Sequence, residues 1–218
     1  MSVEVELNIK KYLDGDGGSE GRKPDARYTS FDYCFNYFRS FYERGESASL
    51  AEPTNLQMSC LQLGFYLASW GMLRGSAELL QKSARHLAPL VMTIAEADAL
   101  LWEIDAHRYT EDNIQRLLDT ARMFRTSYQG MSDTLVTKIM LGVFGNVPAF
   151  DSNFKKGFGV ATFGPKALRN IGVFYRENSM IIDRYRVPTL EFVTGNRTRR
   201  KYTRAKVIDM AFFVEGML

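Results

Sequence analysis

Residues 130–158, GMSDTLVTKIMLGVFGNVPAFDSNFKKGF, predict two successive helices joined by a short link. Ser132 is a suitable N-cap for the first helix, Gly145 suits the left-handed residue just past its end, and Pro148 prevents its continuation. The helix carries one apolar face at helical spacing, formed by Leu135, Val136, Ile139, Met140, Val143 and Phe144. We therefore expect the rest of the chain to pack around this segment.

The second helix of this segment begins after Asp151. A carboxylate at that position can accept a hydrogen bond from a free backbone N–H of the first helical turn. The structural interpretation of Asp151, on general grounds the more common one, is therefore an N-cap.

Residues 130–151 also resemble the helix-hairpin-helix DNA glycosylases. In that family a hairpin of the form G-V-G-x-K-T-A is followed by a helix that ends in A-F-G and then by an aspartate. Gly130 takes the position of the first hairpin glycine, and Gly145 closes the helix. Ser132 stands where the second glycine belongs, and Thr134 stands where the lyase-type members have their catalytic lysine.

The resemblance implies that Asp151 is catalytic, either stabilising positive charge on the sugar or orienting the attacking water. It also implies that backbone N–H groups near Gly130 and Ser132 bind a DNA phosphate at a helix N-terminus. Two outcomes stay open: a monofunctional glycosylase-like enzyme, or a fold that binds DNA without chemistry.

Residues 55–73 are apolar nearly all round, which predicts a helix in the middle of the bundle. We do not expect a membrane span, since four polar residues interrupt the most apolar part, residues 56–73. Trp70 and Arg74, four residues apart, would face a polar turn together. With Tyr66 they are the residues that we expect to line a pocket for an extruded base. Alternatively, Arg74 caps the end of the helix.

A basic cluster lies near the end of the chain: Arg197, Arg199, Arg200, Lys201, Arg204 and Lys206. It suits contact with the phosphates of duplex DNA. The alternative is a solvated loop whose cations pair with the acidic face of the helix that begins at Pro89. Lys155 and Lys156, close to Asp151, would extend the positive surface if the fold brings them near the cluster.

Helical periodicity recurs along most of the chain, so we expect an all-α fold: a single globular bundle of about seven or more helices. Residues 1–27 read as an N-terminal segment with a flexible, glycine-rich connector, and residues 28–218 as the helical domain. The 218 residues are 45% hydrophobic and 24% charged with a net charge of +3, which is ordinary for a globular protein and leaves nucleic-acid binding open.

Several functions lack their sequence signals. His86 and His107 stand in separate segments without a nearby cysteine, so we expect no metal site and no cofactor. Cys34 and Cys60 fall in apolar helical patterns and read as reduced core thiols of a soluble cytoplasmic protein without a membrane segment. The absence of any strong catalytic motif keeps a second interpretation open, a non-enzymatic helical module that binds an unknown protein partner.

Overall fold

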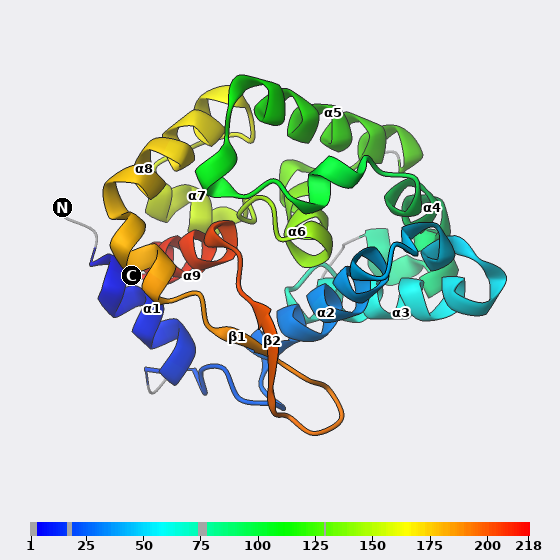
Figure 1. Cartoon of the computed structure of the whole chain (residues 1–218), viewed down its shortest axis with the longest axis horizontal. Helices are drawn as coiled ribbons and strands as arrows, with labels where there is room; N and C mark the ends of the chain where they lie inside the picture. Colours follow the sequence, from blue (N-terminus) through cyan, green and yellow to red (C-terminus); the bar gives the residue numbers. More distant parts are fainter. Residues whose placement is uncertain (1–3, 17–18, 74–77, 129) are drawn as a thin grey trace.

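The computed structural model describes residues 4–16, 19–73, 78–128 and 130–218. In this part of the chain, nine α-helices pack together, and a small two-stranded antiparallel sheet lies at one edge of them (Figure 1). The helices are α1 Val5–Asp14, α2 Ser30–Glu43, α3 Pro53–Ser69, α4 Ala88–Ala95, α5 Glu111–Ser127, α6 Asp133–Phe144, α7 Ser152–Phe158, α8 Pro165–Arg184 and α9 Arg204–Met217. The strands are β1 Pro188–Leu190 and β2 Arg197–Lys201. The predicted mostly helical, multi-helix fold is confirmed.

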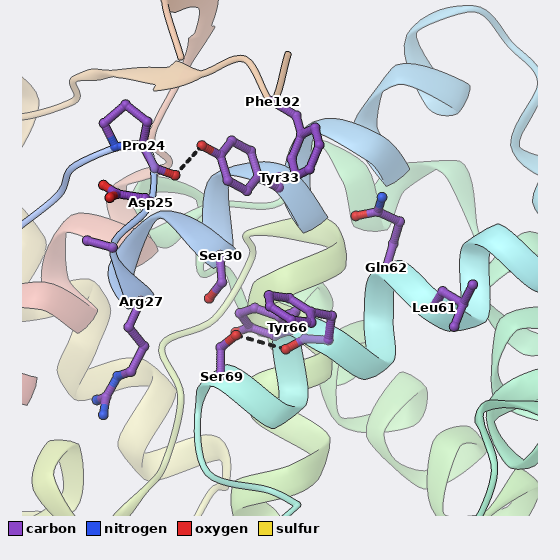
Figure 2. Close-up of a pocket in the computed structure, with 12 residues that line it drawn as sticks. Pro24, Asp25, Arg27, Ser30, Tyr33, Leu61, Gln62, Tyr66, Ser69 and Phe192 are labelled. Carbon is purple, nitrogen blue, oxygen red and sulfur yellow. Dashed lines mark hydrogen bonds between the residues drawn. The ribbon is translucent and has the colours of Figure 1, made fainter. Parts of the chain in front are cut away.

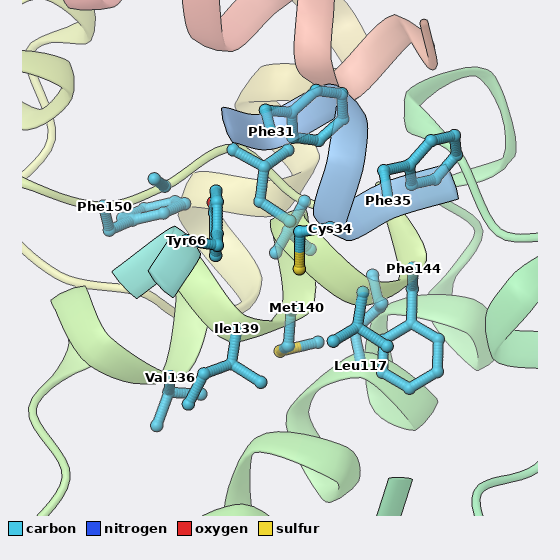
Figure 3. Close-up of a cluster of buried hydrophobic side chains, with 14 of the residues drawn as sticks. Phe31, Cys34, Phe35, Tyr66, Leu117, Val136, Ile139, Met140, Phe144 and Phe150 are labelled. Atoms are coloured by element: carbon cyan, nitrogen blue, oxygen red, sulfur yellow. The ribbon is translucent and has the colours of Figure 1, made fainter. Parts of the chain in front are cut away.

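Helix α6 begins and ends where the sequence predicts. The Ser132 hydroxyl accepts a hydrogen bond from the Leu135 N–H at 3.2 Å, and Gly145 has φ +69° at the C-terminal end. All residues from Leu135 to Phe144 are buried, so α6 is an internal helix rather than one with a single covered face. Its side chains meet aromatic residues of α2 and α3 in the main core (Figure 3).

Helix α9 is the second internal helix, and residues 205–214 are all buried. It packs against α1, α7 and α8. The approach to α7 is close because glycines lie at the contact. A Cβ atom on Gly157 would overlap the Phe212 carbonyl oxygen, and one on Gly216 would overlap the backbone of Asn153. Only glycine fits these two positions without displacing backbone.

Helix α3 is not buried on all sides, contrary to the prediction. Leu63 and Leu67 are fully buried, but Leu61 is 45% exposed and Phe65 is 72% exposed. The reason is its position: α3 packs against α2, α4 and α6, and it lies at the edge of the molecule in Figure 1. One apolar face of α3 is therefore uncovered.

Two further predictions of local structure need correction. The apolar pattern that begins at Pro89 continues to about residue 104 and predicts a single helix, but α4 ends at Ala95 and a short 3₁₀ turn follows. Pro188, Gly195 and Asn196 predict that the segment from Arg186 to Thr203 is a loop with a short extended piece, but it contains the hairpin formed by β1 and β2. Strands this short carry too few alternating residues for a periodic signal.

The N-terminal helix α1 contributes to the same core as the later helices, and Ile9 and Tyr12 are fully buried. Part of the segment predicted as a connector is fixed by an ion pair. The Arg22 guanidinium lies 2.6 Å from Asp32 Oδ2, which also accepts a hydrogen bond from the Leu190 N–H at 2.7 Å. The domain boundary placed at residue 27 stays a prediction.

Candidate functional site

A buried ion pair joins α6 to the start of α7. Lys138 Nζ lies 3.2 Å from Asp151 Oδ2, with side chains that are 5% and 14% exposed. Lys138 also donates a hydrogen bond to the Trp70 carbonyl oxygen at 2.9 Å. The other carboxylate oxygen of Asp151 accepts the Phe154 N–H at 3.0 Å, so Asp151 is the N-cap of α7. Capping and pairing together fix the direction of this carboxylate.

Burial lowers the pKa of Lys138, and the charge of Asp151 partly opposes that effect. A desolvated lysine is closer to its neutral, nucleophilic form than an exposed one, and it can act as a base or form covalent adducts with carbonyl groups. The pair also has a structural interpretation, because it links the start of α7 to α6. Sequence reasoning missed Lys138, although a lone lysine within an apolar helix is a detectable signal.

An aromatic stack lies beside the Lys138–Asp151 pair. The rings of Tyr12 and Tyr28 stack at 4.3 Å, and those of Tyr28 and Trp70 at 5.6 Å. The Arg27 guanidinium lies 5.1 Å from the Trp70 ring, and Lys138 Nζ lies 5.6 Å from it. Lys206 Nζ also lies 5.3 Å from this ring, so Trp70, a predicted pocket residue, has three cations close to its ring.

A second buried pair belongs to the framework of the fold. Lys206 Nζ lies 2.9 Å from Asp209 Oδ2 and donates to the Tyr12 hydroxyl at 2.9 Å. Burial alone would lower the pKa of Lys206, but attraction to Asp209 and Tyr12 raises it, so the ammonium group stays charged. Lys206 is 1% exposed, and this member of the predicted basic cluster is unavailable to DNA.

A cavity of about 630 Å³ opens between the start of α2, the exposed face of α3 and the hairpin (Figure 2). Tyr66 lies at its base with 2% exposure, and the space above includes Phe65 and Phe192. Tyr66 lines this cavity, and Trp70 is connected to it through Arg27, whereas their role in a pocket for an extruded base stays a prediction. Arg74, the third predicted pocket residue, lies outside the described residues.

Two lining hydroxyls of this cavity differ in their bonding. Ser30, at the start of α2, is 7% exposed, and its hydroxyl has no hydrogen-bond partner among the described residues. Ser69 donates to the Phe65 carbonyl oxygen at 2.9 Å. Figure 2 shows both hydroxyls directed towards the same space beside Tyr66. The sequence carries no signal for Ser30, because its lack of a partner depends on the packing of three separate elements.

The predicted basic cluster divides into paired and free cations. Arg200 lies 2.8 Å from Glu43, and Arg204 lies 2.8 Å from Asp183. These acids are not on the helix that begins at Pro89. The other three hairpin cations are exposed, lie on one face of β2 by strand alternation, and have no carboxylate partner in the described part of the chain: Arg197, Arg199 and Lys201.

Lys155 and Lys156 do not extend this row. They lie on α7, which is separated from the hairpin by α9 in the view of Figure 1. The predicted phosphate site at the start of α6 is also altered by a neighbour. Gly130 has φ +80° and Ser132 is exposed, but the Asp133 carboxylate accepts the Phe163 N–H at 2.9 Å and pairs with Arg125. A carboxylate therefore already occupies the positive end of this helix.

The described residues support neither a metal site nor a membrane-spanning helix. They contain no group of three or more histidine, cysteine or acidic side chains arranged to hold a metal ion. None of their helices combines the length and apolarity needed to cross a membrane. The class that fold and site define is a helical protein with a buried lysine–aspartate pair beside an aromatic stack and with a separate cavity lined by aromatic side chains. No family model, no curated protein and no solved structure matches the chain.

Proposed function

We propose that the protein binds duplex DNA and acts on a base within it, with the Lys138–Asp151 pair as the polar centre of the site. The observation that carries this proposal is the 3.2 Å pair itself, buried next to the aromatic stack. Asp151 follows the helix one residue earlier than the catalytic aspartate of the resembled family does, and we assign it the same role. Lys138 adds a cation, whereas the hairpin pattern has its lysine at the position of Thr134.

The reaction that this pair suits is hydrolysis of an N-glycosidic bond. The bond between C1′ and the base breaks, the water oxygen forms a bond to C1′, and the water proton ends on the departing base. Asp151 would stabilise the positive charge that develops at C1′, since a fixed carboxylate in a site of low water content stabilises a cation strongly. Lys138 would act as a positioning residue that holds the second carboxylate oxygen.

The exposed row on β2 supplies contacts for the DNA backbone in this proposal. Arg197, Arg199 and Lys201 project from one face of a strand, where their guanidinium and ammonium groups are free to neutralise phosphates. The loop that carries Phe192 connects this strand to the cavity. Backbone contact and base site would then lie on one side of the molecule.

Release of bases from a panel of damaged duplexes tests this function. We expect the wild-type protein to release at least one base and Asp151→Asn to lose that activity. Asp98→Asn is the matched control, because Asp98 also caps a turn, accepting the Leu100 N–H at 2.9 Å, but is exposed and far along the chain from the pair. Circular dichroism verifies that each variant is folded at the assay temperature. A wild-type protein that neither binds nor cleaves any duplex of the panel rules the proposal out.

A second candidate, a protein-interaction module, is favoured by the uncovered face of α3. Met58, Leu61 and Phe65 are 49%, 45% and 72% exposed, and Phe192 of the neighbouring loop is 73% exposed. Exposed apolar groups that gather in this way mark protein contacts in many proteins. This function predicts that the wild-type chain captures a partner protein and that Phe65→Ser does not.

A further inference from the structure

The cavity between α2, α3 and the hairpin has different chemistry at its two ends. One end is aromatic: the Tyr33 and Phe192 rings meet edge to face at 4.9 Å, and Phe65 also lines the cavity. The other end carries Arg27, and Figure 2 shows its guanidinium pointing away from the Tyr33 and Phe192 rings. A ligand that fills the cavity would therefore be elongated, with an aromatic group at one end and a negative charge at the other.

The middle of the cavity offers a donor without a partner. The Ser30 hydroxyl lies just beneath the lining and makes no hydrogen bond within the described residues. A buried polar group of this kind costs free energy unless a partner satisfies it. Rotation about one side-chain bond re-aims a serine hydroxyl, so Ser30 can meet an acceptor on a ligand in the cavity.

We propose that this cavity is a binding site for a nucleoside monophosphate: the base between Tyr33, Phe65 and Phe192, a ring or sugar acceptor at Ser30, and the phosphate at Arg27. The cavity volume of about 630 Å³ lies within the usual range of small-molecule sites. Aromatic side chains bind any base through its face, and arginine is the usual partner of phosphate.

Two sources supply this chemistry: a free mononucleotide in solution, or one nucleotide of a DNA strand. The proposal rests on the proposed function only for the second source. It does not require catalysis, the Lys138–Asp151 pair or the row of cations on β2. A ligand site for free mononucleotides would make occupancy of the cavity responsive to their concentration.

Isothermal titration with adenosine monophosphate, cytidine monophosphate and a short single-stranded oligonucleotide tests the site. Ser30→Ala removes the unpartnered hydroxyl, and we expect a dissociation constant raised about 2- to 12-fold, the loss of one hydrogen bond. Ser69→Ala is the matched control, because that hydroxyl is already bonded within α3, and it should leave the dissociation constant unchanged. Folding remains intact in Ser30→Ala, since a hydroxyl without a partner contributes no bond to the folded state.

Arg27→Gln tests the charged end of the cavity. In the wild-type protein adenosine monophosphate should bind more tightly than adenosine, and in Arg27→Gln the two should bind alike, because the difference is the contact between phosphate and guanidinium. Arg27 is exposed, so the substitution leaves the core untouched. Equal effects on both ligands would show that Arg27 acts only through its stacking on Trp70, and would refute the assignment of the phosphate.

The outcomes separate the two sources and the two proposals. Binding of mononucleotides that weakens in Ser30→Ala supports a free ligand, and binding of the oligonucleotide alone with the same weakening supports a strand. No saturable binding of any probe below about 1 mM, or binding that is indifferent to Ser30→Ala, overturns the site. Failure of base excision with intact mononucleotide binding would refute the proposed function and leave this site in place.

Discussion

At the scale of single residues, Lys138 is the best side chain for testing the buried pair, because its ammonium group has few partners besides Asp151. It keeps one hydrogen bond, to the Trp70 carbonyl oxygen, and the attraction of the Trp70 ring. Breaking a buried pair by removing one partner is costly because the other charge stays buried without compensation. The stability of the pair and its chemistry can therefore be measured separately.

We expect Asp151→Asn to lower the free energy of unfolding by up to about 3 kcal/mol, the low end for such pairs, because asparagine retains the cap but not the charge. Adding Lys138→Met should restore part of that loss, since no charge is then left alone. Urea unfolding of the two single variants and the double variant measures the coupling. A double variant less stable than Asp151→Asn would mean that the pair is not the source of the loss.

The pH dependence of this effect has a definite sign. The pKa of Lys138 in the folded protein is lowered from 10.5, and the charge of Asp151 limits that lowering. Removing Asp151 lowers the pKa further, so the folded state of Asp151→Asn binds the lysine proton more weakly than the unfolded chain does. Its deficit against the wild type should be fully present at neutral pH and should shrink as pH rises towards 10.5. A deficit that grows with pH would contradict a charged Lys138 at neutral pH.

At the scale of helices, two glycines in helix interiors occupy opposite environments. A Cβ atom on Gly142 of α6 would overlap the ring of Tyr66, whereas one on Gly64 of α3 would lie 3.4 Å from the Leu87 side chain, an ordinary contact. Tyr66 also lies at the base of the cavity. The close packing of α3 on α6 therefore depends on the absence of a side chain at Gly142.

Gly64→Ala should stabilise the protein by about 1 kcal/mol, the difference in helix propensity. Gly142→Ala, the same substitution in a helix of the same core, should destabilise it by about 1–3 kcal/mol, the usual cost of overpacking. It should also weaken ligand binding in the cavity, because Tyr66 must move. Thermal unfolding and titration of the two variants provide the comparison, and equal stabilities would show that Tyr66 yields without cost.

The helix ends were the most predictable features of this chain. Ser132, Gly145 and Asp151 each combine a local side-chain signal with the end of an apolar pattern, and the structure places all three at helix ends. The exposed face of α3 was not predictable, because a helix that is apolar all round does not reveal which side lacks a neighbour. The hairpin was missed because its short strands are stabilised by pairing with each other and by contact of β1 with α2, which no local pattern shows.

At the scale of the whole molecule, the candidate site combines segments far apart in sequence. Asp151 and Tyr66 could be named in advance because each stands in a recognisable local pattern. Ser30 could not, because it matters only through a hydrogen bond that it does not make. Lys138 carried a signal, as the one lysine of an apolar helix, but its partner Asp151 is known only from the fold. Local patterns identify residues that begin or end elements, whereas binding sites depend on which elements meet.

The sequence also could not show which cations of the basic cluster are paired with carboxylates, and this pairing decides which residues a test of DNA binding should replace. Arg200 is held by Glu43, so it would contribute little to phosphate contact even though it lies within the cluster. The exposed row of β2 remains: Arg197, Arg199 and Lys201. If each neutralises one phosphate, the slope of log K against log salt contains about −0.9 from each contact.

Replacing Arg197, Arg199 and Lys201 with alanine should therefore flatten the slope by up to roughly three units while the midpoint of unfolding stays the same, because exposed charges contribute little to stability. Arg200→Ala is the control: it removes a neighbouring cation of the same strand that faces Glu43, so the slope should change by much less than one unit. Fluorescence anisotropy with a labelled duplex at several salt concentrations measures both. If the triple variant and the control flatten the slope equally, the face of β2 does not matter. If neither changes it, the DNA does not contact the hairpin.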